Sequence, residues 1–84
     1  MDSLAEVTMY TTSWCGYCVR LKRFFEREDI EFREVNIEHD VDAARYVGSV
    51  NGGNHTVPTL RFRDGSVLTN PTPAHVLAKV AARG

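Results

Sequence analysis

Two cysteines, Cys15 and Cys18, lie where a strand-forming run of the chain is followed by a helical one. Of all features of the sequence, this placement restricts the possible folds most. Residues 6–11 (EVTMYT) are rich in strand formers and lead directly into the cysteine pair. Behind the pair, Leu21 and Phe25 follow Cys18 at helical spacing, with basic residues between them. The cysteines are therefore expected at the beginning of a helix that follows directly on a strand.

A second strand and a short helix are expected next. Residues 32–37 (FREVNI) have the composition of a strand. Asp40 is placed as the N-cap of a short helix that we expect Gly48 to end. The Gly and Asn content of residues 49–54 (SVNGGN) predicts a loop after that helix.

The last third of the chain predicts a hairpin and a final helix. Residues 57–62 alternate as in a strand, and Asp64-Gly65 is typical of a two-residue hairpin turn leading into a strand over residues 66–69. Thr72 as N-cap and Pro73 at the first helical position predict the beginning of a helix. The apolar stripe of this helix consists of Val76, Leu77, Val80 and Ala81.

This order of elements, βαβαββα, predicts an α/β fold with a four-stranded mixed sheet flanked by helices. A right-handed crossover makes the first two strands parallel, and the tight turn makes the last two antiparallel. The length of 84 residues fits a single domain, which we expect to span residues 1–84.

The composition excludes several classes of function. A formal net charge of -1 provides no basic surface for nucleic acid, and the apolar stretches are too short to span a bilayer. Residues 1–6 lack the basic and apolar regions of a secretion signal. We therefore expect a cytoplasmic protein that binds neither nucleic acid nor membrane. We also expect a monomer, because no long exposed apolar stripe calls for a dimer.

The close pair of cysteines could hold the fold together, ligate a metal or exchange electrons. Cytosolic thiols are kept reduced, and closing so short a loop removes only about 2 kcal/mol of chain entropy, which disfavours a structural disulfide. A zinc site needs four ligands, yet there is no second Cys-x-x-Cys, and His39, His55 and His75 are scattered. Redox chemistry is favoured, with no metal and no tightly bound cofactor.

The position of Cys15 at a helix N-terminus predicts a reactive thiol. Unpaired backbone N–H groups and the helix dipole favour an anion there. Lowering a thiol pKa by about two units requires about 2.7 kcal/mol, whereas the dipole supplies about 0.3–1 kcal/mol. Hydrogen bonds to the sulfur must supply the rest, and Cys18 is placed to donate one. Arg20 and Lys22 are expected to add a positive field nearby.

These motifs together resemble a known family. CGYCVRLK (residues 15–22) is similar to the active site of the glutaredoxin branch of the thioredoxin-like family, with Gly16 where that family usually has proline. Thr56-Val57-Pro58 matches the family's Thr-Val-Pro, whose proline follows a cis peptide bond. YTTSWCGYC, SVNGGN, TVPT and DGSVLTNP are similar in combination to the mycothiol-dependent members, the mycoredoxins. The resemblance covers nearly the whole chain and implies a thioredoxin-like (glutaredoxin) fold.

The resemblance also implies roles for individual residues. Cys15 would be the nucleophile that attacks a mixed disulfide, and Cys18 could resolve an intramolecular disulfide. The cis bond before Pro58 would turn the backbone of Val57 toward the substrate, where the bound thiol could pair with it as an added strand. The expected substrate-binding residues are Trp14, as an exposed platform, together with Tyr17, Arg20, Thr56, Val57, Pro58, Thr69 and Asn70.

Departures from the glutathione-dependent pattern indicate a different thiol. Glutathione-dependent members typically carry a lysine shortly before the first cysteine, where this chain has Thr11 and Thr12, and a Gly-Gly with acidic residues before the last helix, where it has residues 68–72 (LTNPT). The charges of glutathione would lack partners, which costs affinity in a desolvated groove. The sugar and inositol of mycothiol need hydroxyl and amide partners, which Thr69 and Asn70 could offer.

The resemblance therefore implies a reductase of mycothiol mixed disulfides. Mycothiol would be the co-substrate, mycothiolated proteins and a mycothiol disulfide reductase the partners, and NADPH the indirect source of electrons. One alternative is an NrdH-like redoxin that is reduced by thioredoxin reductase and serves ribonucleotide reductase, although its typical WSGFRP segment is absent. A second alternative is a carrier of an iron–sulfur cluster held between two subunits.

Overall fold

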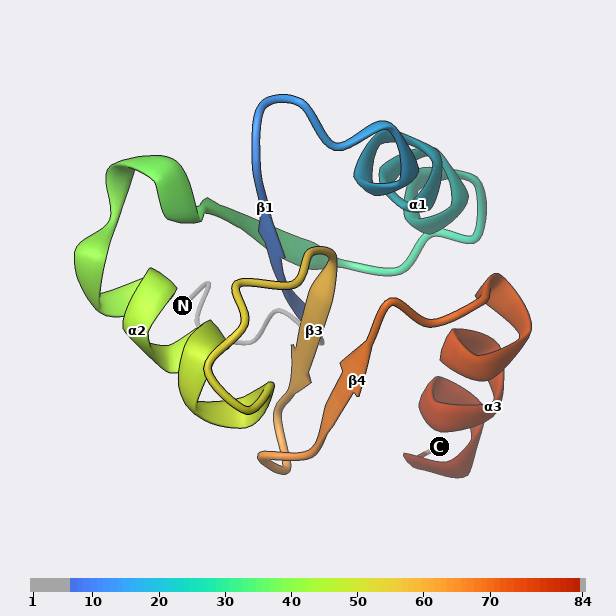
Figure 1. Ribbon diagram of the computed structural model, residues 1–84. Coiled ribbons are helices and arrows are strands. Elements are labelled where there is room, and N and C mark those ends of the chain that lie inside the picture. Colours follow the sequence, from blue (N-terminus) through green and yellow to red (C-terminus); the bar gives the residue numbers. More distant parts are fainter. Residues whose placement is uncertain (1–6, 84) are drawn as a thin grey trace.

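A computed structural model describes residues 7–83, with side chains described up to residue 80 (Figure 1). The alternation of strands and helices and the hairpin of the sequence-based prediction are confirmed, as is the α/β fold class. In chain order the elements are β1 (Val7–Thr11), α1 (Gly16–Arg27), β2 (Phe32–Asn36), the 3-10 helix η2 (Ile37–His39), α2 (Val41–Val50), β3 (Thr59–Phe62), β4 (Val67–Thr69) and α3 (Pro73–Arg83).

The four strands form one mixed sheet in the order β2-β1-β3-β4. β1 and β2 are parallel, because a helix connects them, and β3 is antiparallel to both β1 and β4. In the antiparallel register Val7 lies opposite Phe62, and Tyr10 lies opposite Thr59. The end of β1 that leads into the cysteines is therefore the end at which β3 begins.

The core lies on both faces of this sheet. Side chains alternate along β1, so Val7 and Met9 join a cluster with residues of α1 and α3, whereas Tyr10 joins a smaller cluster with α2 (Figure 1). The larger cluster contains both cysteines and consists of Val7, Met9, Cys15, Cys18, Leu21, Phe24, Phe25, Leu60, Phe62 and Val76. The redox pair is therefore built into the main core.

Helix α2 runs through Gly48 to Val50, so the prediction that Gly48 ends it is wrong. The helix continues through this glycine, and a Cβ atom there would lie 3.4 Å from the ring of His55, which is an ordinary van der Waals distance. Asn51 caps the helix instead, and its N–H donates to the carbonyl of Gly48 at 3.2 Å. The predicted N-cap is confirmed, since the Asp40 carboxylate accepts from the N–H of Ala43 at 3.0 Å.

The turn between β3 and β4 has three residues, 63–65, and not the two that were predicted. Phe62 N–H donates to the Ser66 carbonyl at 2.9 Å, and Gly65 N–H donates to the Phe62 carbonyl at 2.8 Å. Of the two turn residues Asp64 and Gly65, only the glycine has a positive φ, of 90°. A two-residue type I′ turn needs positive φ at both positions, so the chain uses the three-residue form with glycine last.

The ends of other elements also differ from the prediction. Ile37 belongs to η2 and not to β2, and β3 begins at Thr59, after the proline that cannot donate to the ladder. At the start of α3 the predicted cap is confirmed, since the Thr72 hydroxyl accepts from His75 N–H at 3.2 Å.

On α3, Val76 is buried and Val80 packs against the main cluster, but Leu77 is 43% exposed. The side chain of Ala81, predicted on the same stripe, lies outside the described residues, as does Glu6 at the predicted start of β1. Within residues 7–83, no helix has the length and apolar character that crossing a membrane requires.

Candidate functional site

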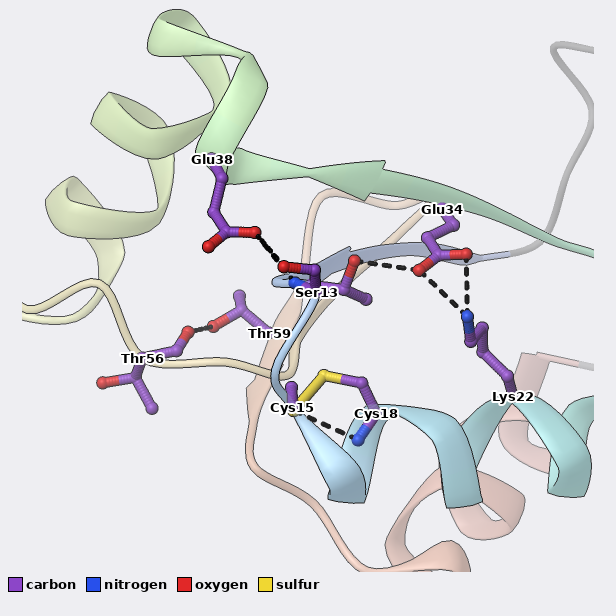
Figure 2. The surroundings of a disulfide bond; sticks show 9 residues. Ser13, Cys15, Cys18, Lys22, Glu34, Glu38, Thr56 and Thr59 are labelled. Carbon is purple, nitrogen blue, oxygen red and sulfur yellow. Dashed lines mark hydrogen bonds and ion pairs between the residues drawn. A yellow bond between two sulfur atoms is a disulfide. The ribbon is translucent and has the colours of Figure 1, made fainter.

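Cys15 is the N-cap of α1, and the two cysteines are joined by a disulfide with their Cα atoms 5.3 Å apart (Figure 2). Cys15 has extended backbone angles, and its Sγ accepts a hydrogen bond from the N–H of Cys18 at 3.1 Å. This is the backbone donor that the sequence predicts for the sulfur. Cys15 is 7% exposed and Cys18 is 1% exposed, so Cys15 is the more exposed of the two residues.

The loop that carries Trp14 is held by Glu38 of η2, the short helix that directly follows β2. The N–H and the hydroxyl of Ser13 both donate to one carboxylate oxygen of Glu38, at 2.9 and 2.7 Å (Figure 2). These two bonds, the backbone bond first, lower the pKa of Glu38 from its ordinary value. Trp14 is 71% exposed, as expected for a platform beside the reactive cysteine.

An ion pair between α1 and β2 changes the electrostatics that were expected near the cysteines. The ammonium group of Lys22 lies 3.1 Å from both carboxylate oxygens of Glu34 on β2 (Figure 2). The buried hydroxyl of Thr11 also donates to that carboxylate, at 2.9 Å. The positive charge of Lys22 is therefore offset by Glu34. The guanidinium of Arg20 lies over the ring of Tyr17, 5.9 Å from its centroid.

The bond between Val57 and Pro58 is cis, as the resemblance implied. Val57 packs against both core clusters, the larger of which contains the two cysteines. The carbonyl of Pro58 accepts from the N–H of Asn70 at 2.8 Å, and Asn70 has a positive φ of 49°. Two candidate segments that are distant in sequence, residues 56–58 and 69–70, are thus tied together.

The end of β4 is joined both to α1 and to α2. The hydroxyl of Tyr17 donates to the carbonyl of Pro71 at 2.8 Å, and the exposed Thr69 hydroxyl donates to the side chain of Asn51 at 2.7 Å. Thr56 is half-buried, and its carbonyl accepts from the hydroxyl of Thr59 at 2.8 Å (Figure 2). The candidate binding residues therefore lie in two groups, the cysteine side (residues 12–20) and the β3–β4 side (residues 56–58 and 69–71), which the bond from Tyr17 to Pro71 joins.

Three residues that hold this site were not found from the sequence. Glu38 is 25 positions from the Ser13 that it binds, so no local pattern marks the contact. Glu34 looked like an ordinary strand carboxylate. Asn51 stands before a Gly-Gly pair, which is typical of a helix C-terminus, but nothing in the sequence indicates its bond to Thr69.

The side chains and backbone groups around the two cysteines are suited to thiol–disulfide exchange. Across residues 7–80, whose side chains are described, no three His, Cys, Asp or Glu residues gather in a way that could hold a metal ion. A sulfur at a helix N-terminus with a backbone N–H aimed at it is arranged to stabilise a thiolate, and a neighbouring thiol can form or release a disulfide. The geometry defines a thioredoxin-like thiol–disulfide oxidoreductase.

Comparison with known proteins agrees with this class. The family model described as Glutaredoxin matches residues 7–67. The crystal structure of a glutaredoxin from Archaeoglobus fulgidus superimposes with a TM-score of 0.76 at 25% identity, covering 94% of this chain and 89% of that one. The chain belongs to the glutaredoxin family.

Curated relatives of this chain occur in Mycobacterium tuberculosis and in Corynebacterium glutamicum. The chain is 59% identical over 76 residues to a Mycobacterium tuberculosis protein provisionally described as a glutaredoxin, with 90% of each chain covered. It is 39% identical over 79 residues to Mycoredoxin 1 of Corynebacterium glutamicum, covering 94% of this chain and 98% of that protein. The predicted resemblance is confirmed: the protein is a glutaredoxin-like thiol oxidoreductase similar to mycoredoxin.

Proposed function

We propose that the protein reduces mycothiol mixed disulfides, with Cys15 as nucleophile and mycothiol as reductant. The observation that carries the choice of thiol is the similarity to Mycoredoxin 1 over nearly the full length of both chains. The site supports it, because residues 68–72 bring no charged side chain to the end of β4 that could pair with the charged groups of glutathione.

The proposed cycle consists of two successive thiol–disulfide exchanges at Cys15. The Cys15 thiolate attacks the mycothiol sulfur of a mycothiolated protein, the old S–S bond breaks, and the reduced protein leaves as a thiolate that takes up a proton. A second mycothiol, as thiolate, attacks the mycothiol sulfur bound to Cys15. This step releases mycothiol disulfide and regenerates the Cys15 thiolate, which the N–H of Cys18 stabilises.

The disulfide between Cys15 and Cys18 represents a second route. If the Cys18 thiolate attacks Cys15 before mycothiol does, free mycothiol leaves and the protein holds the intramolecular disulfide. Two electrons from mycothiol then return it to the dithiol. In the proposed cycle this route is a side branch, so Cys18 is dispensable for turnover.

The proposed setting follows from the same chemistry. The protein acts in the cytoplasm as a monomeric glutaredoxin-like domain. Its partners are mycothiolated proteins and a mycothiol disulfide reductase, which passes on electrons from NADPH. The exposed Trp14 and the segments 56–58 and 69–70 contact the bound mycothiol and the substrate, together with Tyr17 and Arg20.

The test measures NADPH oxidation by the purified protein acting on a mycothiol mixed disulfide, with mycothiol and its disulfide reductase present. Matched assays supply glutathione with glutathione reductase, or thioredoxin reductase alone. We expect turnover in the mycothiol system and little in the others. Turnover only with thioredoxin reductase would overturn the proposal in favour of an NrdH-like electron donor. A brown protein with visible absorption after anaerobic purification would favour cluster transport.

A further inference from the structure

The side-chain amide of Asn51 joins three parts of the molecule beside the proposed binding site. Its Nδ2 donates to the carbonyl of Val47 in α2 at 2.9 Å and to the hydroxyl of Thr59 on β3 at 3.1 Å. Its Oδ1 accepts from the hydroxyl of Thr69 at the end of β4, at 2.7 Å. Asn51 itself is half-buried, so this network is partly shielded from water.

The chemistry of the partners fixes the direction of every hydrogen bond in this network. The carbonyl of Val47 can only accept, so the NH2 group of Asn51 must face it. The hydroxyl of Thr59 gives its single proton to the carbonyl of Thr56, at 2.8 Å, and therefore accepts from Asn51. The oxygen of Asn51 is left facing Thr69, and Thr69 must donate to it.

The consequence falls on Thr69, the exposed end of the network. A hydroxyl has one proton to donate and two lone pairs that accept. Because Asn51 takes the proton, the remaining capacity of Thr69 is to accept from an O–H or N–H group of a ligand. A carboxylate in the same place would meet an oxygen with no proton to offer, which leaves the carboxylate unpaired at a cost.

On the basis of the proposed function, we propose that Thr69 is a specificity-determining residue that accepts a hydrogen bond from a hydroxyl of a neutral, polyol-bearing thiol. Asn51 is the positioning residue, because it takes the Thr69 proton and so fixes the direction of that hydrogen bond. The site then discriminates against thiols that place a carboxylate beside Thr69. Asn51 acts through Thr69 and need not contact the ligand.

Thr69→Val and Thr69→Ser are the matched variants that test the accepting role. The probes are 2-hydroxyethyl mixed disulfides of mycothiol and of glutathione, which share the same leaving thiol. We expect Thr69→Val to raise KM for the mycothiol probe about 5-fold with kcat unchanged, and Thr69→Ser to stay near the wild type. Glutathione kinetics should not change in Thr69→Val. Equal KM values for both variants and the wild type, or equal losses with both probes, would overturn the proposal.

Asn51→Ala tests the positioning role, because it frees the Thr69 proton to donate to a carboxylate. The ratio of kcat/KM for the mycothiol probe to that for the glutathione probe should fall about 5-fold or more, partly through improved use of glutathione. If Asn51→Ala does not fold, Asn51→Ser replaces it, since its hydroxyl can donate to the carbonyl four residues earlier but cannot also reach Thr69. An unchanged ratio in a folded variant contradicts the role of Asn51.

Failure of this inference is distinguishable from failure of the proposed function. If the wild type does not turn over the mycothiol probe at all, the proposed function is wrong. If it does, and Thr69→Val behaves as Thr69→Ser does, only the inference about Thr69 is wrong.

Discussion

The two sides of the site are held by different kinds of bond. On the cysteine side, the loop before Cys15 is fixed by an ionised carboxylate, that of Glu38, which accepts two hydrogen bonds from Ser13. On the β3–β4 side, the binding segments are joined by the neutral amide of Asn51 and by hydroxyl groups. One side therefore depends on the ionisation of its anchor, and the other does not.

This difference separates the covalent chemistry from the proposed recognition of the thiol. The nucleophile belongs to the cysteine side, where the Glu38 carboxylate holds the loop and the N-terminus of α1 favours a thiolate. The β3–β4 side offers hydrogen bonds of fixed direction without a formal charge. Substitutions on the two sides should accordingly differ in the size of their effects and in the dependence of those effects on pH, and three predictions test that difference.

The largest effect is expected from Cys15→Ser, which removes the nucleophile. We expect turnover of the mycothiol mixed disulfide to fall about 1,000-fold or more, because a serine hydroxyl does not ionise near neutral pH and gives a poor nucleophile. Cys18→Ser is the matched control on the same side and should retain substantial turnover. Steady-state rates in the coupled assay measure both. Equal losses would show that the dithiol route is obligatory and would break the proposed single-cysteine cycle.

A smaller effect, on stability, is expected from Thr59→Val on the β3–β4 side. Thr59 is fully buried, and the change leaves the Thr56 carbonyl without its donor and Asn51 with one acceptor fewer. We expect a loss of about 1–3 kcal/mol in the free energy of unfolding, measured in urea.

Thr11→Val is the control for this change, because Thr11 is equally buried and also donates through its hydroxyl. Its acceptor, Glu34, keeps Lys22 and reaches water, so the loss should be smaller, about 1 kcal/mol. A loss in Thr11→Val that equals or exceeds that in Thr59→Val would contradict the expectation that an unpaired buried carbonyl costs more than one lost bond to a carboxylate that keeps other partners.

The smallest effect is expected from Glu38→Gln and depends on pH. Because the folded protein lowers the pKa of Glu38 below its ordinary value of 4.5, the carboxylate stabilises the fold above that pH. This contribution is lost as the pH falls through the lowered pKa. The melting temperature of the wild type should therefore exceed that of Glu38→Gln at pH 7, and the gap should close in acid.

The control for the pH dependence is Glu31→Gln, which removes an exposed carboxylate just before β2, at the end of the sheet away from the cysteines. Its melting temperature should follow the wild type across the same pH range. A gap between wild type and Glu38→Gln that is constant from pH 7 to pH 3 would show that the hydrogen bonds to Ser13 do not depend on ionisation.

The parts of the structure that local chemistry determines were predictable from the sequence. Caps are made by neighbouring residues, so Asp40 and Thr72 could be recognised from their positions alone. The placement of Cys15 at the beginning of α1 followed from the change of periodicity around it. The order of the elements then determined the mixed sheet, because crossover connections and tight turns have known handedness and direction.

The parts that depend on packing between distant segments were not predictable. Gly48 looks like a helix end in the sequence, yet the helix continues through it to Val50, and the glycine lies against His55. Lys22 looks like a solvated charge, yet its partner lies on the next strand. The bond from Thr69 to Asn51 spans 18 residues and exists only once β4 lies beside β3. A single sequence carries no local signal for such contacts.

The three-residue turn between β3 and β4 lies at the opposite end of the sheet from the reactive cysteines. Because Phe62 lies opposite Val7, this turn is at the end of the sheet farthest from the point where β1 leads to Cys15 (Figure 1). Arg63 is exposed there, and turn tips of this kind tolerate attachments well. A tether at position 63 would therefore attach the protein to an electrode or to a fluorescent reporter at the end of the sheet away from the cysteine pair.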